Sequence, residues 1–349
     1  MIDFIIVGGG LAGLHFANQC LLNKKTFLLI DTNKNNSSKV AAGVYNPVIL
    51  KRYTLSWDAK NQLSLLGKVY KSISSFTNLE IDFKIPLRRR LFSIEEQNNW
   101  YLASEKSHLS DYLVTPILSQ EFPGIVSNFG FGEVSETGFV NSKVLIESFI
   151  SKLTLLDFYV NDSFDYDLLE LNAQSISYKS IEAQHIVFAE GFNIAQNPFF
   201  NALPIIGSKG EVLTIKAPDL ALDFILKGNV FILPLGNHLF KVGSTYSWDF
   251  LNDEPTEEGL QYLQKEIESL ISVPFTIIAH EAGIRPASRD RKPIIGTHPK
   301  YSRLHVLNGL GTRGVMIAPS MALQLYRNIS EGIPIDPEAD LKRFKKIIW

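Results

Sequence analysis

The first 31 residues carry the clearest pattern of hydrophobic and polar positions in the chain. Residues 2–7 form a short apolar run, broken only by Asp3, which predicts a strand. Residues 14–23 carry apolar side chains at helical spacing, and residues 26–30 form a second apolar strand that ends on Asp31. The pattern therefore predicts a strand, a helix and a second strand.

A glycine-rich turn joins the first strand to the helix. It reads Gly-Gly-Gly-Leu-Ala-Gly over residues 8–13, which is the spacing of a dinucleotide-binding turn. We expect Gly8 to permit the tight turn, Gly10 to let a pyrophosphate approach the backbone, and Gly13 to let the helix lie close to the strand. The N-terminus of the helix offers unpaired N–H groups and partial positive charge to the phosphates.

Asp31 at the end of the second strand selects among dinucleotides. Its carboxylate can accept hydrogen bonds from ribose hydroxyls and would repel a 2′-phosphate, so we expect FAD or NAD and not NADP. The polar residues 32–39 that follow would offer hydroxyls and amides to the cofactor. The alternative is a glycine-rich turn in an ordinary parallel sheet, but both strands, the helix and the acid together favour the dinucleotide site.

Along the rest of the chain, the predicted elements change from a mixture of helices and strands to mainly antiparallel strands. Helical spacing is found in residues 55–75, 141–155, 256–271 and 315–331. Strands are predicted at residues 185–189, 211–215, 229–233, 238–242, 275–284 and 304–307, with hairpins at residues 168–178 and at Gly236-Asn237. Residues 207–245 are therefore expected to form antiparallel sheet.

Three stretches allow more than one interpretation. Small residues at Ala41, Ala42 and Gly43 are typical of an ordinary turn or of a chain pressed against a large flat group. Residues 85–94 predict a strand on which Arg88 and Arg90 share one face. That face could meet an anionic ligand, but we favour a solvated strand edge. Residues 342–346 predict a solvated helix end.

A second glycine-rich turn lies at residues 309–314, directly after a predicted strand. Only 35 residues follow it, and no second strand there ends in an acid, so it cannot begin another nucleotide domain. We interpret it as a turn that leads into the helix at residues 315–331. The N-terminus of that helix would point at a site of developing negative charge.

Composition narrows the class of protein. The 349 residues suffice for two domains, and 45% hydrophobic with 20% charged residues argues against disorder. The net charge of −2 gives no general attraction to nucleic acid or anionic lipid. No apolar run reaches 18 residues, so we expect no membrane span and a cytoplasmic protein. The only cysteine, Cys20, excludes an intrachain disulfide, and we predict no metal site.

Six motifs follow one another along the chain. They are residues 8–13 with Asp31, residues 41–43, residues 207–213, residues 242–245, residues 283–286 and residues 309–314. In this order they resemble the D-amino-acid oxidase or glycine oxidase group of FAD-dependent oxidoreductases (the DAO family). This group includes the C-terminal oxidase domain of the bifunctional tRNA wobble-uridine modification enzyme. The resemblance spans nearly the whole chain.

The resemblance implies an α/β fold with two domains. A Rossmann-like FAD-binding domain (GR2-type) would be assembled from residues 1–78, 138–206 and 280–349. An antiparallel β-sheet substrate domain would consist of residues 79–137 and 207–279.

The resemblance also implies site residues. Arg285 would clamp the substrate carboxylate through two parallel hydrogen bonds, and Tyr246 would line the pocket. Residues 309–314 would lie near the pyrimidine edge of the flavin. The predicted cofactor-binding residues are Gly8, Gly10, Leu11, Ala12, Gly13, Asp31, Thr32, Ser38, Lys39, Ala41, Ala42, Gly43, Ala189, Gly191, Gly283, Gly309, Gly311, Thr312, Arg313, Gly314 and Val315.

The implied function is oxidation of a C–N bond in a small, carboxylate-bearing amino acid or secondary amine, with hydride transfer to flavin N5. FAD is expected to be non-covalent, because relatives with covalent flavin use a cysteine late in the chain. Oxygen or another acceptor would reoxidise it. A 2-hydroxy acid, or a carboxymethylaminomethyl group in tRNA, is an alternative substrate, although the net charge makes nucleic acid unfavourable. The sequence leaves substrate identity and oligomeric state open.

Overall fold

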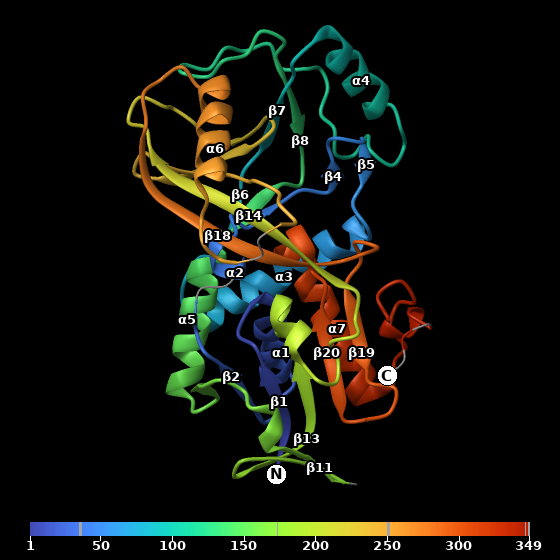
Figure 1. Ribbon diagram of the computed structural model, residues 1–349. Coiled ribbons are helices and arrows are strands. Elements are labelled where there is room, and N and C mark those ends of the chain that lie inside the picture. The colour runs from blue at the N-terminus through green and yellow to red at the C-terminus, as the bar shows by residue number, and fades with distance from the viewer. Residues whose placement is uncertain (35–36, 173, 250–251, 346, 348–349) are drawn as a thin grey trace.

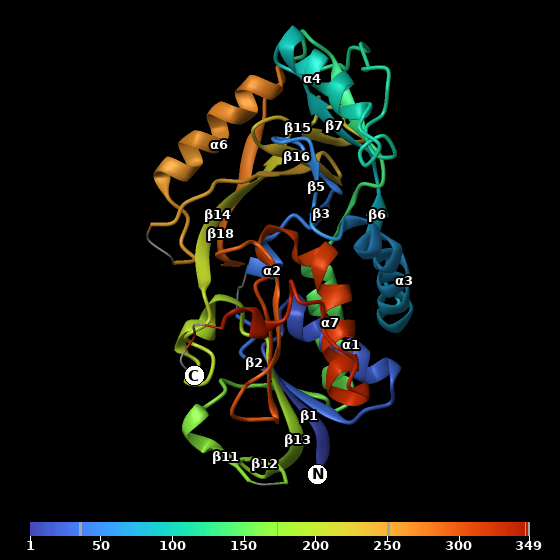
Figure 2. The same cartoon turned by 90° about the vertical axis from the view of Figure 1, so that its right-hand side faces the viewer.

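Two β-sheets, one above the other in Figure 1, organise the chain. The computed structural model describes residues 1–34, 37–172, 174–249, 252–345 and 347. An eight-stranded sheet lies in the lower part of the view with the N-terminus, and a seven-stranded sheet lies in the upper part. Two long strands, β14 (Ile205–Lys216) and β18 (Thr276–Ser288), run between the two parts in both views (Figures 1 and 2).

The lower sheet is built around the predicted N-terminal unit. Strand β1 (Ile2–Val7) pairs in parallel with β2 (Phe27–Asp31) and with β13 (Ile181–Phe188). Helix α1 (Leu11–Leu22) connects β1 to β2. The predicted strand, helix and strand are thus confirmed. The remaining strands are β10 (Tyr159–Asn161), β11 (Leu169–Leu171), β12 (Ile176–Tyr178), β19 (Ile294–Thr297) and β20 (Leu304–Asn308).

Four helices share one hydrophobic core with one face of this sheet. Besides α1 they are α3 (Ala59–Thr77), α5 (Ser142–Leu155) and α7 (Gly314–Glu331). Alternate residues of β1 enter this core and the core on the opposite face, as expected for a strand with both faces buried. The predicted cap of α5 is present, since the Asn141 side chain accepts a hydrogen bond from the Val144 N–H.

The upper sheet has the strand order β18-β14-β17-β16-β15-β7-β8. The predicted hairpin joins β16 (Phe231–Gly236) to β17 (Leu239–Gly243). Helix α6 (Glu257–Leu270), capped by Thr256, packs its apolar side chains into the core on one face. The other strands are β15 (Ile225–Lys227), β7 (Leu87–Arg90) and β8 (Phe131–Val134).

Short elements complete the fold. A three-stranded sheet contains β3 (Val44–Tyr45), β9 (Gly138–Val140) and β6 (Asp82–Lys84), and β4 (Val48–Ile49) pairs with β5 (Thr54–Leu55). Two further helices are α2 (Ser37–Val40) and α4 (Ile94–Ser104). In the part of the chain that the structure describes, no helix is both long and apolar enough to span a membrane.

The solvated-edge interpretation of residues 85–94 is wrong. Strand β7 lies between β15 and β8, so it is interior to the sheet. Arg88 Nε lies 2.8 Å from Glu133 Oε2, and Arg89 Nη2 lies 3.0 Å from Glu96 Oε1. Arg88 and Arg89 are therefore paired with carboxylates of the protein, and Arg90 Nη1 donates to the carbonyl oxygen of Ser269.

Two other expectations concern the domain boundaries and the C-terminal stretch. The proposed domain boundaries at residues 206 and 280 fall inside β14 and β18, so the chain crosses them as continuous strand. The division into two domains stays a prediction. The C-terminal stretch is not a solvated helix end, because Arg343 Nε donates to Asp290 Oδ2 at 2.8 Å within a short 3-10 helix at Leu341–Arg343. Lys346 lies outside the described residues.

Several histidines are held neutral inside the lower part. His305 Nε2 lies 3.0 Å from His185 Nδ1, and its own Nδ1 lies 2.9 Å from Thr297 Oγ1. Burial lowers the pKa of His15 to about 3 and that of His185 to about 4. It also lowers the pKa of His305 well below the usual range. The folded state therefore binds fewer protons than the unfolded state below about pH 6.5.

This burial predicts acid destabilisation. The contribution of the neutral histidines to the free energy of unfolding should be complete above about pH 6.5 and should fall as the pH drops towards 4. Partly exposed His185 should supply roughly 1 kcal/mol of it. We expect the thermal midpoint of His185→Gln to fall less between pH 7 and pH 5 than that of the wild type. The exposed His108 supplies the control, because His108→Gln should leave the loss unchanged. An equal fall of the thermal midpoint in the wild type and in His185→Gln would contradict this role of His185.

Candidate active site

The first glycine turn packs tightly against the protein's own backbone. Gly8 has a φ of +104°, and a Cβ there would lie 2.4 Å from the carbonyl oxygen of Ala189. A Cβ on Gly13 would lie 1.9 Å from the carbonyl oxygen of Gly8. Gly8 therefore permits the tight turn beside Ala189, and Gly13 lets α1 lie close to the end of β1, as the sequence predicts.

Gly10 is different, because its open side faces a side chain and not backbone. A Cβ there would meet the Ser38 hydroxyl at 3.2 Å. The same hydroxyl accepts a hydrogen bond of 3.2 Å from the N–H of Leu11, the first residue of α1. The Ser38 hydroxyl thus already contacts the N-terminus of α1, next to Ala12, which is another predicted cofactor-binding residue. This cradle, which a Cβ would fill, fits a pyrophosphate.

The loop after β2 is shaped around Asp31. Its Oδ2 accepts a hydrogen bond of 2.9 Å from the N–H of Asn33. A Cβ on Gly9 would lie 3.0 Å from the Asp31 carboxyl carbon, so a side chain there would crowd Asp31, a constraint that the sequence analysis missed. Buried Lys39 donates from Nζ to Asn33 Oδ1 at 2.7 Å and so supports the same loop. Thr32 lies half-buried between them.

Segments distant in sequence meet at this turn. A Cβ on Gly283 of β18 would lie 2.9 Å from Ser37 Cα, at the start of the helix that carries Ser38. The carbonyl oxygen of Gly191 accepts a hydrogen bond of 2.8 Å from Asn308 Nδ2 at the end of β20. A Cβ on Gly314 would lie 3.0 Å from Leu11 Cδ1. The predicted cofactor residues from four segments are therefore brought together.

The small residues at 41–43 pack against other parts of the protein chain. Gly43 has a φ of +70°, and a Cβ there would lie 1.8 Å from the carbonyl oxygen of Val140. The carbonyl oxygen of Ala41 accepts a hydrogen bond of 3.2 Å from Ser142 Oγ. Close packing against β9 explains Gly43 without a cofactor. A cofactor role for this stretch, including half-buried Ala42, stays a prediction.

The second glycine turn positions the N-terminus of α7. Gly309 and Gly311 have φ values of +73° and +56°, a conformation that favours glycine. A short 3-10 helix at Gly311–Arg313, with Thr312 exposed, leads into α7. The carbonyl oxygen of Val315 accepts a hydrogen bond of 2.6 Å from Tyr70 OH, which anchors the first turn of α7 to α3.

Arg285 is placed by the register of β14 and β18. Arg285 stands opposite Ser208, and Gly283 stands opposite Gly210. A Cβ on Gly210 would lie 1.8 Å from Arg285 Nη2, so the guanidinium occupies the space that Gly210 leaves. Nη2 donates a hydrogen bond of 2.8 Å to Ser244 Oγ.

Tyr246 covers the other side of this guanidinium. Its ring centroid lies 4.6 Å from Arg285 Cζ, which is a cation–π contact, and its side chain is 57% exposed. Burial lowers the pKa of Arg285, an effect that Tyr246 partly opposes. Among the described residues no carboxylate pairs with Arg285. The predicted pair of Arg285 and Tyr246 is thus in contact and lacks an anion.

Ser208 is a further candidate that the sequence analysis did not single out. It is buried, and its hydroxyl has no hydrogen-bond partner among the described residues. Ser208 and Ser244 both lie in motifs quoted above, but only the strand register shows that they flank Arg285.

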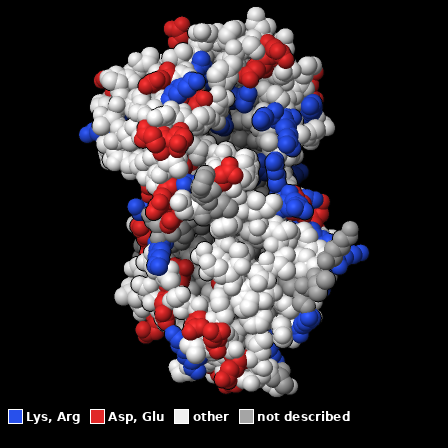
Figure 3. All heavy atoms as spheres, in the orientation of Figure 1, with Lys and Arg blue, Asp and Glu red and all other residues white. Residues whose placement is uncertain are grey.

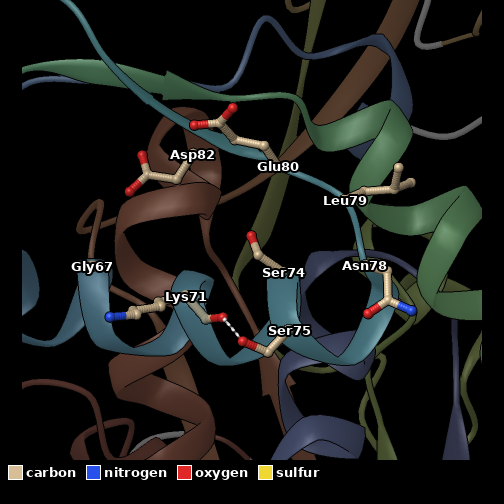
Figure 4. A pocket seen from close by; sticks show the side chains of 8 residues that line it. All are labelled: Gly67, Lys71, Ser74, Ser75, Asn78, Leu79, Glu80 and Asp82. Carbon is tan, nitrogen blue, oxygen red and sulfur yellow. Dashed lines mark hydrogen bonds between the residues drawn. The ribbon is translucent and has the colours of Figure 1, made fainter.

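Two cavities of the protein surface lie away from these residues. Figure 4 shows one of about 450 Å³ at the C-terminal end of α3, lined by Gly67, Lys71, Ser74, Ser75, Asn78, Leu79, Glu80 and Asp82. A second, of about 530 Å³, involves the C-terminal segment around Phe344. Neither contains a predicted site residue. We place the candidate active site at Arg285 and the glycine turns, because charge, orphaned polar groups and backbone N–H groups converge there.

The comparison with known families identifies the class of enzyme. A model of the family DAO, FAD dependent oxidoreductase, matches residues 3–326. This chain belongs to that family and is an FAD-dependent oxidoreductase. The resemblance and the α/β fold class expected from the sequence are therefore confirmed.

Two curated relatives match most of the chain. Glycine oxidase of Bacillus subtilis is 21% identical over 334 residues, covering 91% of this chain and 90% of that protein. The tRNA 5-methylaminomethyl-2-thiouridine biosynthesis bifunctional protein of Legionella pneumophila is 24% identical over 375 residues, covering 95% of this chain. The match covers 55% of that protein, so the chain spans about half of its length.

Solved structures show the same fold at low sequence identity. Glycine oxidase from Bacillus cereus superimposes with a TM-score of 0.80 at 16% identity, covering 96% of both chains. Iminodiacetate oxidase from Chelativorans gives 0.79 at 17% identity, covering 97% of this chain and 98% of that one. The likeness extends over both sheets.

The cradle at Gly10 predicts a specific loss of cofactor. Gly10→Ala should fold, because the nearest atom is a movable serine hydroxyl, but its methyl group should raise the Kd for FAD at least about tenfold, or ~1.4 kcal/mol. Titration of the apoprotein with FAD measures this. Gly67→Ala is the matched control, because no atom lies within 4 Å of a Cβ there. Unchanged FAD affinity in Gly10→Ala would place the pyrophosphate elsewhere.

Proposed function

We propose that this protein oxidises the C–N bond of a small amine that carries a carboxylate, such as an amino acid or a secondary amine. The observation that supports this most directly is Arg285, a half-buried guanidinium with only neutral partners. A buried cation without an anion is unfavourable, and a planar guanidinium matches a carboxylate with two parallel hydrogen bonds. The glycine oxidase and iminodiacetate oxidase relatives act on substrates of this kind, as their names state.

The chain's residues bind, orient and stabilise charge in this reaction. When bound, FAD supplies a hydride acceptor. Arg285 holds the carboxylate and thereby fixes the direction in which the C–H bond of the substrate points. The first turn of α7 offers N–H groups and the positive end of the helix dipole to developing negative charge. No strong base is required if the amine binds neutral, and water would hydrolyse the imine product.

The cofactor should be non-covalent. Cys20, the only thiol of the chain, is fully buried in α1, and burial raises its pKa well above the usual range. Such a thiol is a poor nucleophile. Denaturation should therefore release FAD into solution. We expect oxygen or another acceptor to reoxidise the reduced cofactor.

A tRNA substrate is the second candidate. The bifunctional tRNA-modifying relative matches 95% of this chain at an identity similar to that of glycine oxidase. Figure 3 shows Lys and Arg gathered along the right-hand side of this face, at the level where the upper and lower parts meet. A carboxymethylaminomethyl group is itself a secondary amine with a carboxylate, so Arg285 could serve it as well. A tRNA gel shift that weakens with salt would support this candidate.

The substrate is identified by anaerobic titration. A panel of amino acids, secondary amines and 2-hydroxy acids is added to the holoenzyme while its visible flavin bands are recorded. We expect an amine-bearing acid to bleach these bands. Bleaching by a hydroxy acid alone would overturn the amine proposal, and bleaching by none would turn attention to tRNA.

Removal of the clamp should impair binding of any carboxylate substrate. Arg285→Gln should lower kcat/KM by about a hundredfold or more, since the variant loses a charge-assisted bidentate contact, ~3 kcal/mol. Arg285→Lys should recover only part of the loss, because an ammonium cannot make the planar pair. FAD content should stay at the wild-type level in both variants. Wild-type kinetics in Arg285→Gln would show that the carboxylate binds elsewhere.

A further inference from the structure

A second guanidinium, that of Arg313, lies close to the same site. Arg313 is half-buried at the start of α7, and it makes no side-chain hydrogen bond or ion pair among the residues that the structure describes. Burial lowers its pKa, and the Tyr246 side chain partly opposes this effect. The same phenol affects Arg285. Two guanidinium groups therefore share one neighbour, Tyr246.

The backbone brings the turn that carries Arg313 next to the end of β18. Arg285 and Ala287 are two residues apart on this strand, so their side chains share a face. Ala287 bridges to Leu310, so the segment before Arg313 runs beside the edge of β18, and a Cβ on Gly311 would lie 3.9 Å from Ala287 Cβ. The turn that carries Arg313 therefore lies beside the part of β18 that carries Arg285.

Three other half-buried arginines of the fold do have counter-ions. Arg88, Arg89 and Arg343 each contact a carboxylate at 2.8 to 3.0 Å. The carboxylate on the same face of β18 as Arg285 is Glu281, roughly 13 Å away along the strand, and it lies 3.9 Å from Lys241 Nζ. Arg90 and Arg303 have no carboxylate either, but they donate to backbone carbonyl oxygens, whereas the Arg313 guanidinium donates to no protein group among the described residues.

A single carboxylate would neutralise only one of the two guanidinium groups. Leaving the other half-buried guanidinium unpaired is unfavourable, whereas a ligand with two anionic groups would satisfy both. We propose that the site binds an amine substrate with two carboxylates, one held by Arg285 and the other by Arg313. This inference rests on the proposed function, and it assigns Arg313 to the binding of substrate and not to the binding of the cofactor.

The competing partner of Arg313 is FAD itself, because Gly314 contacts Leu11 at the first glycine turn. The two possible partners of Arg313, the cofactor and the substrate, lead to different expected results. If Arg313 serves the cofactor, its removal changes FAD affinity or the flavin reduction potential without any ligand present. If it serves the substrate, its removal changes only the binding of ligands with a second carboxylate.

The test titrates the holoenzyme with unreactive acids and follows the perturbation of the flavin spectrum. Acetate is the monocarboxylate probe, and malonate, succinate and glutarate are the dicarboxylate probes. In the wild type we expect at least one dicarboxylate to bind tenfold or more tightly than acetate. The chain length that binds best reports the separation of the two guanidinium groups.

Arg313→Met should weaken the best dicarboxylate at least tenfold while the Kd for acetate stays within twofold. Arg327→Gln is the control, since it removes the same charge from an exposed position about 21 Å further along α7 and should change neither value. Equal weakening of acetate and dicarboxylates in Arg313→Met, or a changed FAD Kd or flavin potential, would overturn the proposal. So would a wild type that binds acetate as tightly as every dicarboxylate.

Failure of this inference is distinguishable from failure of the proposed function. Arg285→Gln should weaken acetate and dicarboxylates alike, because it removes the clamp that both share. Unchanged acetate binding in Arg285→Gln would reject the proposed function itself. With substrates, the same comparison is made between glycine and iminodiacetate, and Arg313→Met should raise KM for iminodiacetate far more than for glycine.

Discussion

The antiparallel pairing of β14 with β18 is the constraint on which the candidate active site depends. Two glycines, Gly210 and Gly283, face each other across this pair, and one of them leaves the space that the Arg285 guanidinium fills. The neighbouring strand β17 pairs with β14 and ends just before Tyr246, so the same register brings the phenol over the guanidinium. A shift of one residue would turn Arg285 to the opposite face, against the core under α6.

The glycines of the cofactor turn are required for two different reasons. Gly8 and Gly13 are required because backbone atoms of the protein come too close for a side chain. Gly10 is required only if something outside the chain must approach, since its nearest neighbour is a movable hydroxyl. Sequence spacing treats the three alike. The structure separates those that make the turn possible from the one that leaves it accessible.

Local patterns could be predicted from the sequence, whereas features set by distant neighbours could not. The N-terminal unit, the hairpin before Leu239 and the capped helix α5 depend on residues close together in the chain, and all three are found. Strand β7 was misjudged because an interior or edge position depends on β15, more than a hundred residues later. The orphaned hydroxyl of Ser208 could not be foreseen, since it becomes visible only when β14 is aligned with β18.

The length of β18 has a consequence for how the protein moves. The strand continues without a break from Thr276 to Ser288, and beyond it Arg289 N–H donates to the carbonyl oxygen of Pro204 at 3.2 Å. The bridge between Ala287 and Leu310 ties the same end to the segment after β20. A strand held at this end by two neighbouring segments resists bending there, so we expect no hinge between the upper sheet and the lower part at this point. Entry and exit of small molecules would then depend on rearrangement of side chains around the site, such as the exposed ring of Tyr246.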